Sequence, residues 1–247
     1  MSRFASFDGV ELSYTDEGEG APVVLLHGFG ADSKTNWGRS GVAEALVAAG
    51  RRVVLLDARG HGQSDKPHDV AAYADAAMAT DLDRLIEHLG AEAEVVGYSM
   101  GAIVALVASG RDAPIRSVVA GGIGDATLRR LTTNAVAIAA AMEADDPDSI
   151  TDASARAFRT FAEATKADRR ALAAVQRAGL VDHLDLAAVQ VPVLVIVGDR
   201  DTLAGSAQGL ASQLSDGRAA TVSGDHINAP LDPAFARETV AVLAEQR

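Results

Sequence analysis

Short apolar runs rich in β-branched residues recur along the chain and predict buried strands. They cover residues 23–26, 53–56, 94–96, 115–120, 193–197 and, with a weaker pattern, 219–222. Each run is unalternated and leads into a loop, as expected for strands buried on both faces. Helical pattern covers residues 42–49, 71–89, 102–109, 203–214 and 233–245. This alternation predicts right-handed crossovers and therefore an α/β fold, with a mostly parallel sheet covered by helices on both faces.

The N-terminal segment has the pattern of a hairpin. Residues 4–7 and 11–15 are candidate strands on either side of Asp8-Gly9, which is a strong signal for a two-residue turn. We therefore expect an antiparallel hairpin at one edge of the otherwise parallel sheet.

Residues 125–188 interrupt the alternation, because they contain no convincing strand. Alanine-rich helical pattern covers residues 128–144, 154–164 and 168–178. A helical insertion between two strands of an open sheet lies at its carboxyl edge, where ligands bind. We therefore expect a short helical cap at 125–188 on a core formed by residues 1–124 and 189–247. Extra helices packed on a face of the sheet are the alternative.

Composition narrows the classes of function. The chain has 247 residues, with 22 Lys and Arg against 34 Asp and Glu, and a formal net charge of −12 at pH 7. This acidic balance argues against nucleic acid and anionic membrane surfaces as partners. The absence of cysteine excludes disulfides, thiolate metal sites and a cysteine nucleophile. No segment is apolar over the length of a signal peptide or a membrane span, so we expect a cytoplasmic protein.

The run Gly97-Tyr98-Ser99-Met100-Gly101 carries the clearest chemical signal. It joins the predicted strand 94–96 to the predicted helix 102–109, so Ser99 lies on a sharp turn with its hydroxyl exposed above the sheet. Glycines two positions before and after the serine are needed where neighbouring backbone leaves no room for a Cβ. The helix N-terminus stabilises negative charge that develops nearby. A serine that only caps the helix is the structural alternative.

Four other motifs accompany this turn. They are His-Gly-Phe-Gly at 27–30, Asp-Ala-Arg-Gly-His-Gly-Gln-Ser at 57–64, Gly-Asp-Arg-Asp at 198–201 and Gly-Asp-His at 224–226. With this set the chain resembles the α/β-hydrolase fold superfamily over essentially its whole length, and in particular its serine-nucleophile, carboxylesterase-like members. Serine stands where related epoxide hydrolases and haloalkane dehalogenases carry aspartate, which argues against those two activities.

The resemblance implies a catalytic triad with Ser99 as the nucleophile. Its base is then His226, which follows the last predicted strand. The acid is Asp201, the third residue after the strand-ending glycine, and Asp199 is a turn residue. Asp125, after the preceding strand, is the outside candidate for the acid.

An oxyanion hole belongs to the same machinery. The residue after the nucleophile supplies one backbone donor, the N–H of Met100, and the resemblance implies that Phe29 supplies the other. Structural roles are expected for four further residues: Asp57, Arg59, Ser64 and Asp225.

None of the remaining histidines carries a signal for catalysis. His27 and His61 lie in the glycine-rich loops, where hydrogen bonds that hold a loop are the preferred interpretation. His88 lies on a charged helix and is expected on the solvated surface. For His68 and His183 the sequence carries no signal.

Together these residues predict acyl transfer to water on a small or medium carboxylic ester or lactone, with no metal or organic cofactor. Phe158 and Phe161 are the only aromatic residues of the predicted cap, which suggests an apolar cavity. The sequence does not indicate an oligomeric state.

Other reactions on the same triad stay open. Carbon–carbon bond hydrolysis of vinylogous diketone acids is the main alternative, and it needs a cationic group for the substrate carboxylate. The cap arginines are candidates for that group, although helix arginines are usually solvated: Arg129, Arg130, Arg156 and Arg159. Thioesterase and perhydrolase activity are further options, and a non-catalytic ligand-binding role is the outside alternative.

Overall fold

The computed structural model describes residues 1–111, 113–130, 134–180 and 184–245, with the side chains of residues 128–130 outside this description. One eight-stranded sheet runs through this part of the chain in the order β1-β2-β4-β3-β5-β6-β7-β8. The strands are β1 (Ser2–Ala5), β2 (Glu11–Glu17), β3 (Pro22–Leu26), β4 (Arg52–Leu56), β5 (Ala93–Tyr98), β6 (Ile115–Gly121), β7 (Val193–Gly198) and β8 (Gly217–Val222). β1 and β2 pair antiparallel, β2 is also antiparallel to β4, and all other pairs are parallel. The predicted α/β fold with a mostly parallel sheet is confirmed.

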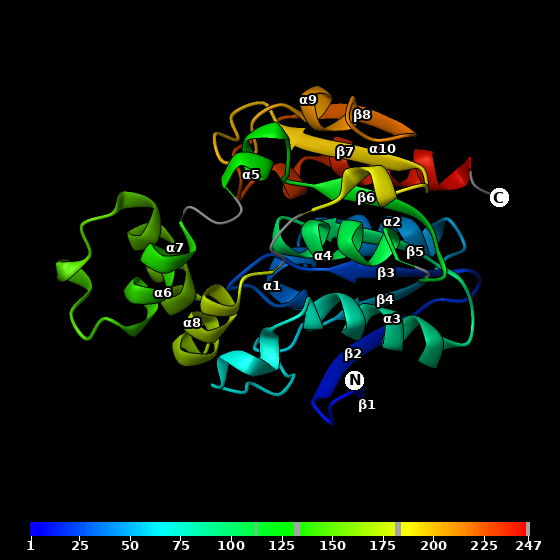
Figure 1. Ribbon diagram of the computed structural model, residues 1–247. Coiled ribbons are helices and arrows are strands. Elements are labelled where there is room, and N and C mark those ends of the chain that lie inside the picture. Colours follow the sequence, from blue (N-terminus) through cyan, green and yellow to red (C-terminus); the bar gives the residue numbers. More distant parts are fainter. Residues whose placement is uncertain (112, 131–133, 181–183, 246–247) are drawn as a thin grey trace.

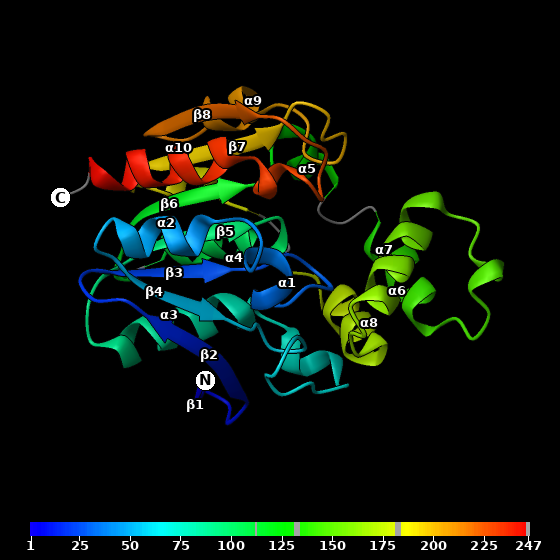
Figure 2. The same ribbon diagram turned by 180° about the vertical axis from the view of Figure 1, so that it is seen from behind.

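Helices cover both faces of this sheet. α3 and α4 lie on the face toward the viewer in Figure 1, and α1, α2 and α10 lie on the opposite face, toward the viewer in Figure 2. α9 packs beside β7 and β8. The bounds of these helices are α1 (Ser33–Trp37), α2 (Val42–Ala48), α3 (Ala77–Leu89), α4 (Met100–Ser109), α9 (Ala207–Ala211) and α10 (Pro233–Ala244).

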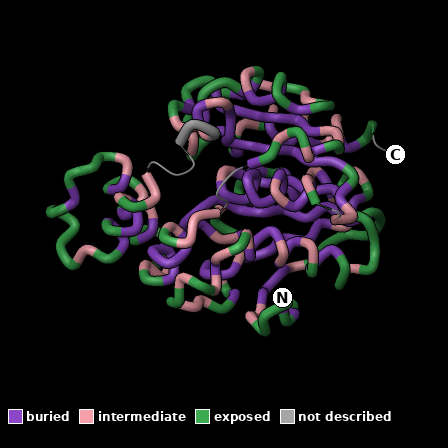
Figure 3. Tube along the Cα trace, viewed as in Figure 1, coloured by how far each residue is buried: buried purple, intermediate pink, exposed green. Residues whose placement is uncertain are grey.

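The core consists of two apolar clusters, one on each face of the sheet. The central strands are buried along most of their length, as Figure 3 shows. Burial on both faces explains why the strand runs are apolar without alternation. None of the described helices has the length and apolar character that crossing a membrane requires.

The predicted strands all form, and their ends shift by at most two residues, but the N-terminal turn differs from the prediction. Phe7 lies outside β1 and is 49% exposed. The Gly9 N–H donates to Ser6 O and the Ser6 N–H donates to Val10 O, at 3.1 and 2.9 Å. With φ of +84° at Gly9, this is a three-residue turn and not the expected two-residue one.

Two predicted helices are shorter than expected. The pattern over 71–89 is divided into a 3₁₀ helix, η1 (Val70–Tyr73), and α3, because Asp75 and Ala76 both adopt φ of +54°. The pattern over 203–214 yields only α9. Its first residues are drawn out of the helix because the backbone N–H groups of Leu203 and Ala204 donate to the Asp201 carboxylate.

Residues 125–188 contain helices but no strand in their described part, and most of these helices lie beyond the carboxyl ends of the parallel strands (Figures 1 and 2). The short helix that ends at Ala188 lies instead near Gly110, at the end of α4. The predicted helix over 128–144 is divided between α5 and α6, and residues 131–133 lie outside the described ranges. The helices are α5 (Asp125–Arg130), α6 (Ala135–Glu143), η2 (Pro147–Ser149), α7 (Ala153–Ala164), α8 (Arg169–Ala178) and η3 (Leu186–Ala188).

α6, α7 and α8 form a helical lobe, whereas α5 lies against α9 of the core. Direct polar contacts join the lobe to the core. The Thr165 hydroxyl donates to Gly30 O at 2.8 Å, and His68 Nε2 lies 2.9 Å from Asp168 Oδ2. Whether 125–188 is a cap with those limits stays a prediction.

Candidate active site

Ser99 lies between β5 and α4 with φ of +51° and ψ of −111°. A positive φ is costly for a residue with a side chain and persists only when its surroundings enforce it. Close contacts of the glycines two positions before and after Ser99 show how the surroundings enforce it. A Cβ on Gly97 would lie 2.4 Å from Gly101 O, and a Cβ on Gly101 would lie 2.4 Å from Leu26 O, so neither position admits another residue without displacing backbone.

Three loops bring Ser99, His226 and Asp201 together at the carboxyl edge of the sheet, after β5, β8 and β7 respectively. His226 Nε2 lies 3.0 Å from Ser99 Oγ, and His226 Nδ1 lies 2.7 Å from Asp201 Oδ2. The carboxylate of Asp201 has no solvent exposure, and the imidazole is 16% exposed. The three side chains therefore form one continuous hydrogen-bonded row that ends at the serine hydroxyl.

Further hydrogen bonds hold Asp201 and His226 in place. The second oxygen of Asp201, Oδ1, accepts the N–H groups of Leu203 and Ala204, at 3.0 Å each. The Tyr98 hydroxyl donates to the carbonyl of His226 at 2.7 Å. Since both ring nitrogens of His226 have partners, the imidazole has one defined orientation.

The other carboxylates considered from the sequence have different partners. Asp125 Oδ1 accepts the N–H of Ser206 at 2.8 Å. Asp199 Oδ1 accepts the N–H of Gly224 at 2.8 Å, which closes a turn. Asp225 Oδ1 accepts two N–H groups that follow it in the chain, which is the structural role expected of it. Of these residues and Asp201, the structure places Asp201 beside the imidazole.

Phe29 and Met100 are the two residues expected to supply the oxyanion-hole N–H groups. Met100 is the first residue of α4, where N–H groups have no partner within the helix. Within the described residues, neither N–H donates a hydrogen bond to another protein group. Phe29, Met100 and Ser99 all line one cavity.

Asn36 on α1 is a residue that sequence analysis did not identify. Its Oδ1 accepts the N–H of Gly28 at 2.9 Å, next to Phe29, while its Nδ2 is buried and has no partner in the described part of the chain. It therefore fixes the loop that carries the Phe29 N–H. The one available signal was Asp32, which caps α1 through Thr35 N–H and could have revealed the helix. It would not have revealed the bond to Gly28.

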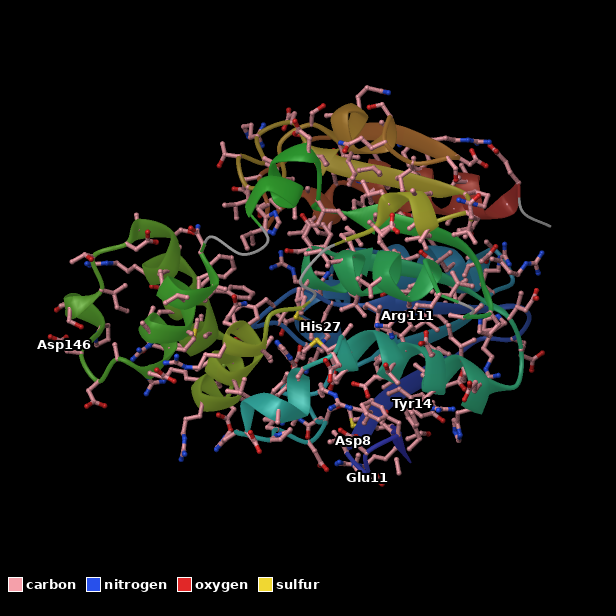
Figure 4. The ribbon with its side chains drawn as sticks, in the orientation of Figure 1. Asp8, Glu11, Tyr14, His27, Arg111 and Asp146 are labelled. Atoms are coloured by element: carbon pink, nitrogen blue, oxygen red, sulfur yellow. The ribbon has the colours of Figure 1, made fainter. Side chains whose placement is uncertain are left out.

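The glycine-rich loops hold two buried histidines. His27 Nδ1 bonds to Gly28 O at 2.8 Å, and its Nε2 accepts the Ala58 N–H at 3.1 Å, so it joins two loops as expected. It lies at the lobe-facing end of the core (Figure 4). His61 Nδ1 bonds to Arg59 O at 3.0 Å. Burial lowers the pKa of both rings, that of His61 to about 3, so both are neutral.

The residues predicted to hold loops do so. Asp57 accepts the N–H groups of Ser33 and Gln63, and the Ser64 hydroxyl donates to Asp57 O. The fully buried Arg59 pairs with Asp81 and Asp8.

Neither His68 nor His88 lines the cavity. His88 is exposed, as expected, and stacks on Phe4 with ring centroids 5.5 Å apart. His68 contacts the lobe through Asp168. His183 lies outside the described residues.

A cavity of about 170 Å³ opens above Ser99 and His226 and extends under the lobe. Phe29 and Phe158 meet across it edge to face, with centroids 5.8 Å apart. Phe161 packs instead against Gly30. Most of the lining is apolar, as the aromatic and aliphatic composition of the segment suggested. Among the described residues, no group of three or more histidine, aspartate or glutamate side chains could hold a metal ion.

Of the arginines in residues 125–188 whose side chains are described, none lines this cavity. Arg156 donates to Ile150 O, and Arg159 donates to the carbonyls of Ala141 and Ala144. The expectation of solvated helix arginines is wrong for Arg159, whose side chain is only 3% exposed because it ties α7 to the end of α6. The side chains of residues 129 and 130 lie outside the described part.

Comparison with known proteins agrees with this architecture. The model of the alpha/beta hydrolase fold family matches residues 21–147, and the chain belongs to that family. Two solved esterases share the fold: one from Thermogutta terrifontis (TM-score 0.79, 22% identity, 99% of this chain and 98% of that one) and one from Exiguobacterium antarcticum (TM-score 0.77, 19% identity, 99% and 98%).

Curated relatives match over a shorter stretch. Epoxide hydrolase A of Mycobacterium tuberculosis is 39% identical over 105 residues, which cover 41% of this chain and 32% of that protein. A 2-hydroxy-6-oxononadienedioate/2-hydroxy-6-oxononatrienedioate hydrolase of Pseudomonas putida is 43% identical over 109 residues, 41% and 37% of the two chains. The matched stretch spans about a third of the length of these relatives.

Proposed function

We propose that the protein is a serine hydrolase that cleaves small or medium carboxylic esters or lactones. The observation that carries this proposal is the hydrogen-bonded row Ser99–His226–Asp201, which ends at a cavity large enough for a small organic molecule. A serine hydroxyl is a weak nucleophile until a base takes its proton, and His226 is within reach of that proton.

The proposed reaction has two steps, acylation of Ser99 and hydrolysis of the acyl-enzyme, and the same groups act in both. Ser99 Oγ attacks the ester carbonyl while His226 Nε2 accepts its proton, and Asp201 stabilises the imidazolium through Nδ1. His226 then returns the proton to the departing alcohol. Water, activated by the same imidazole, attacks the acyl-enzyme and releases the acid, so the cycle needs no metal or organic cofactor.

The N–H groups of Phe29 and Met100 are the proposed oxyanion hole. Both residues line the cavity with Ser99, and neither N–H has a described protein partner, so both can donate hydrogen bonds to the oxyanion of the tetrahedral intermediate. Loss of one such donor typically raises the barrier by about 3 kcal/mol. Asn36 supports this function indirectly, because it positions the backbone that carries Phe29.

Carbon–carbon bond hydrolysis is the second candidate, and the similarity to the Pseudomonas putida hydrolase favours it. That reaction would use the same serine and histidine. Arg156 and Arg159, the two described arginines considered for the substrate carboxylate, donate to backbone carbonyls, and ester hydrolysis therefore stays the first candidate.

Turnover of p-nitrophenyl esters from acetate to palmitate tests the proposal, with Ser99→Ala as the control. We expect activity that peaks at short or middle chain lengths and is lost in Ser99→Ala. Activity that survives this substitution would contradict the assignment of the nucleophile.

A further inference from the structure

The cavity wall that faces the catalytic row contains polar side chains without partners. Gln176 on α8 and Ser154 on α7 line the cavity together with Asn134, which precedes α6. All three are half-buried. Within the described residues, none of their side chains makes a hydrogen bond to protein. All three belong to the lobe segment, whereas Ser99 and His226 belong to the core.

Unpaired amides in a mostly apolar cavity indicate a ligand group. A half-buried polar side chain whose water is displaced by a bound ligand must regain a hydrogen bond from that ligand, so such side chains favour a ligand with a matching polar group. Gln176 lines the cavity next to Val175 of α8 and to Gly179 and Leu180, which follow α8, so its neighbours in the lining are apolar.

The chemistry of these side chains selects the kind of group. An amide both donates and accepts, and a hydroxyl does the same, which suits a neutral hydroxyl or carbonyl group. His226 is the one titratable side chain among the described residues of the lining, and it is engaged in the catalytic row. A neutral polar substituent therefore matches this wall better than a charged one.

We propose that Gln176, with Ser154 and Asn134, forms a polar subsite that recognises a hydroxyl or carbonyl substituent on the ester substrate. The inference rests on the proposed hydrolase function and adds the substrate class. Hydroxy- and oxo-substituted esters and lactones are preferred over plain alkanoate esters, because only they satisfy the amide of Gln176.

A pair of matched substrates tests this subsite: methyl 3-hydroxybutanoate and methyl butanoate, with acid release followed by titration. The wild-type protein is expected to have the higher kcat/KM for the hydroxy ester. Gln176→Leu, which keeps the side-chain size but removes the amide, should lower kcat/KM for the hydroxy ester about tenfold and leave the plain ester unchanged. Gln208→Leu, on the exposed surface of α9, is the matched control and should change neither value. Equal effects of Gln176→Leu on both esters, or none, would overturn the subsite.

A binding measurement separates this inference from the proposed function. Titration of Ser99→Ala with each ester, followed by NMR, reports binding without turnover. If the wild type hydrolyses neither ester but Ser99→Ala binds the hydroxy ester and loses affinity on adding Gln176→Leu, the proposed function fails and the subsite stands. If the wild type hydrolyses both esters but Gln176→Leu alters neither kcat/KM nor binding, the function stands and the subsite is wrong.

Discussion

The core and the helical lobe contribute to the candidate site in different ways. In the core, Ser99, His226 and Asp201 are held by hydrogen bonds to one another and to the backbone, and the glycines beside Ser99 leave no free space. The lobe contributes the far wall of the cavity, and its polar contacts with the core include those of Thr165 and His68. The core is therefore suited to positioning the reacting groups, and the lobe to choosing the substrate.

The largest expected effect comes from changing the carboxylate that lies beside the imidazole of His226. Asp201→Asn should lower kcat by about 10³–10⁴-fold, because the amide favours the wrong tautomer of His226. Steady-state hydrolysis of a short p-nitrophenyl ester measures it. Asp125→Asn is the control and should stay within about threefold of the wild type, since Asp125 bonds to Ser206 N–H. If the two variants lose activity equally, Asp201 is not the orienting acid.

Crowding of the core backbone predicts a stability effect. Gly101→Ala places a methyl group 2.4 Å from Leu26 O and should lower the free energy of unfolding by about 3 kcal/mol. Gly90→Ala is the matched control, because Gly90 has positive φ but nothing within 4 Å of the added Cβ; it should cost only about 1 kcal/mol. Urea denaturation compares them, and equal costs would refute the role of Leu26.

Buried His61 makes the core sensitive to acid. Its pKa is lowered from 6.5 to about 3 by burial and secondarily by His27, so below pH 6.5 the unfolded chain binds a proton that the folded chain does not. The free energy of unfolding therefore decreases as the pH is lowered from 6.5 towards 3, by up to about 1.4 kcal/mol per pH unit.

Denaturation at pH 7.5 and pH 5.5 tests the contribution of His61. His61→Asn, which removes the titrating ring, should reduce the dependence on pH. His88→Asn at the surface should leave it as in the wild type. A dependence that is identical in all three proteins would assign the acid sensitivity to other groups.

The smallest effects are expected where the lobe meets the core. His68→Gln and Thr165→Val should each lower stability by less than about 1 kcal/mol, since each removes a partly exposed contact. They should change KM by a few-fold and kcat little. If either variant lost activity as completely as Asp201→Asn, contacts of the lobe would also be needed for the chemical step.

The sequence predicted the core better than the lobe for a physical reason. Strands buried on both faces are apolar without interruption, and the crowded turn at Ser99 requires glycines at fixed spacing, so both leave local signals. Two carboxylates follow the strand β7, and the resemblance to the family selected Asp201. By contrast, the bond of Asn36 to Gly28 and the burial of Arg159 between α7 and the end of α6 depend on packing between segments. Residues 203–206 were predicted as helix because no local signal shows that Asp201 takes their N–H groups.

Stoichiometric labelling by a fluorophosphonate tests the central claim most directly, because the reagent reacts with an activated serine whatever the natural substrate. Intact-mass measurement and peptide mapping should find one adduct per chain on Ser99, none in Ser99→Ala, and much slower labelling in His226→Gln. An unlabelled wild type, or an adduct on another residue, would contradict the proposed activation of Ser99 by His226 and Asp201.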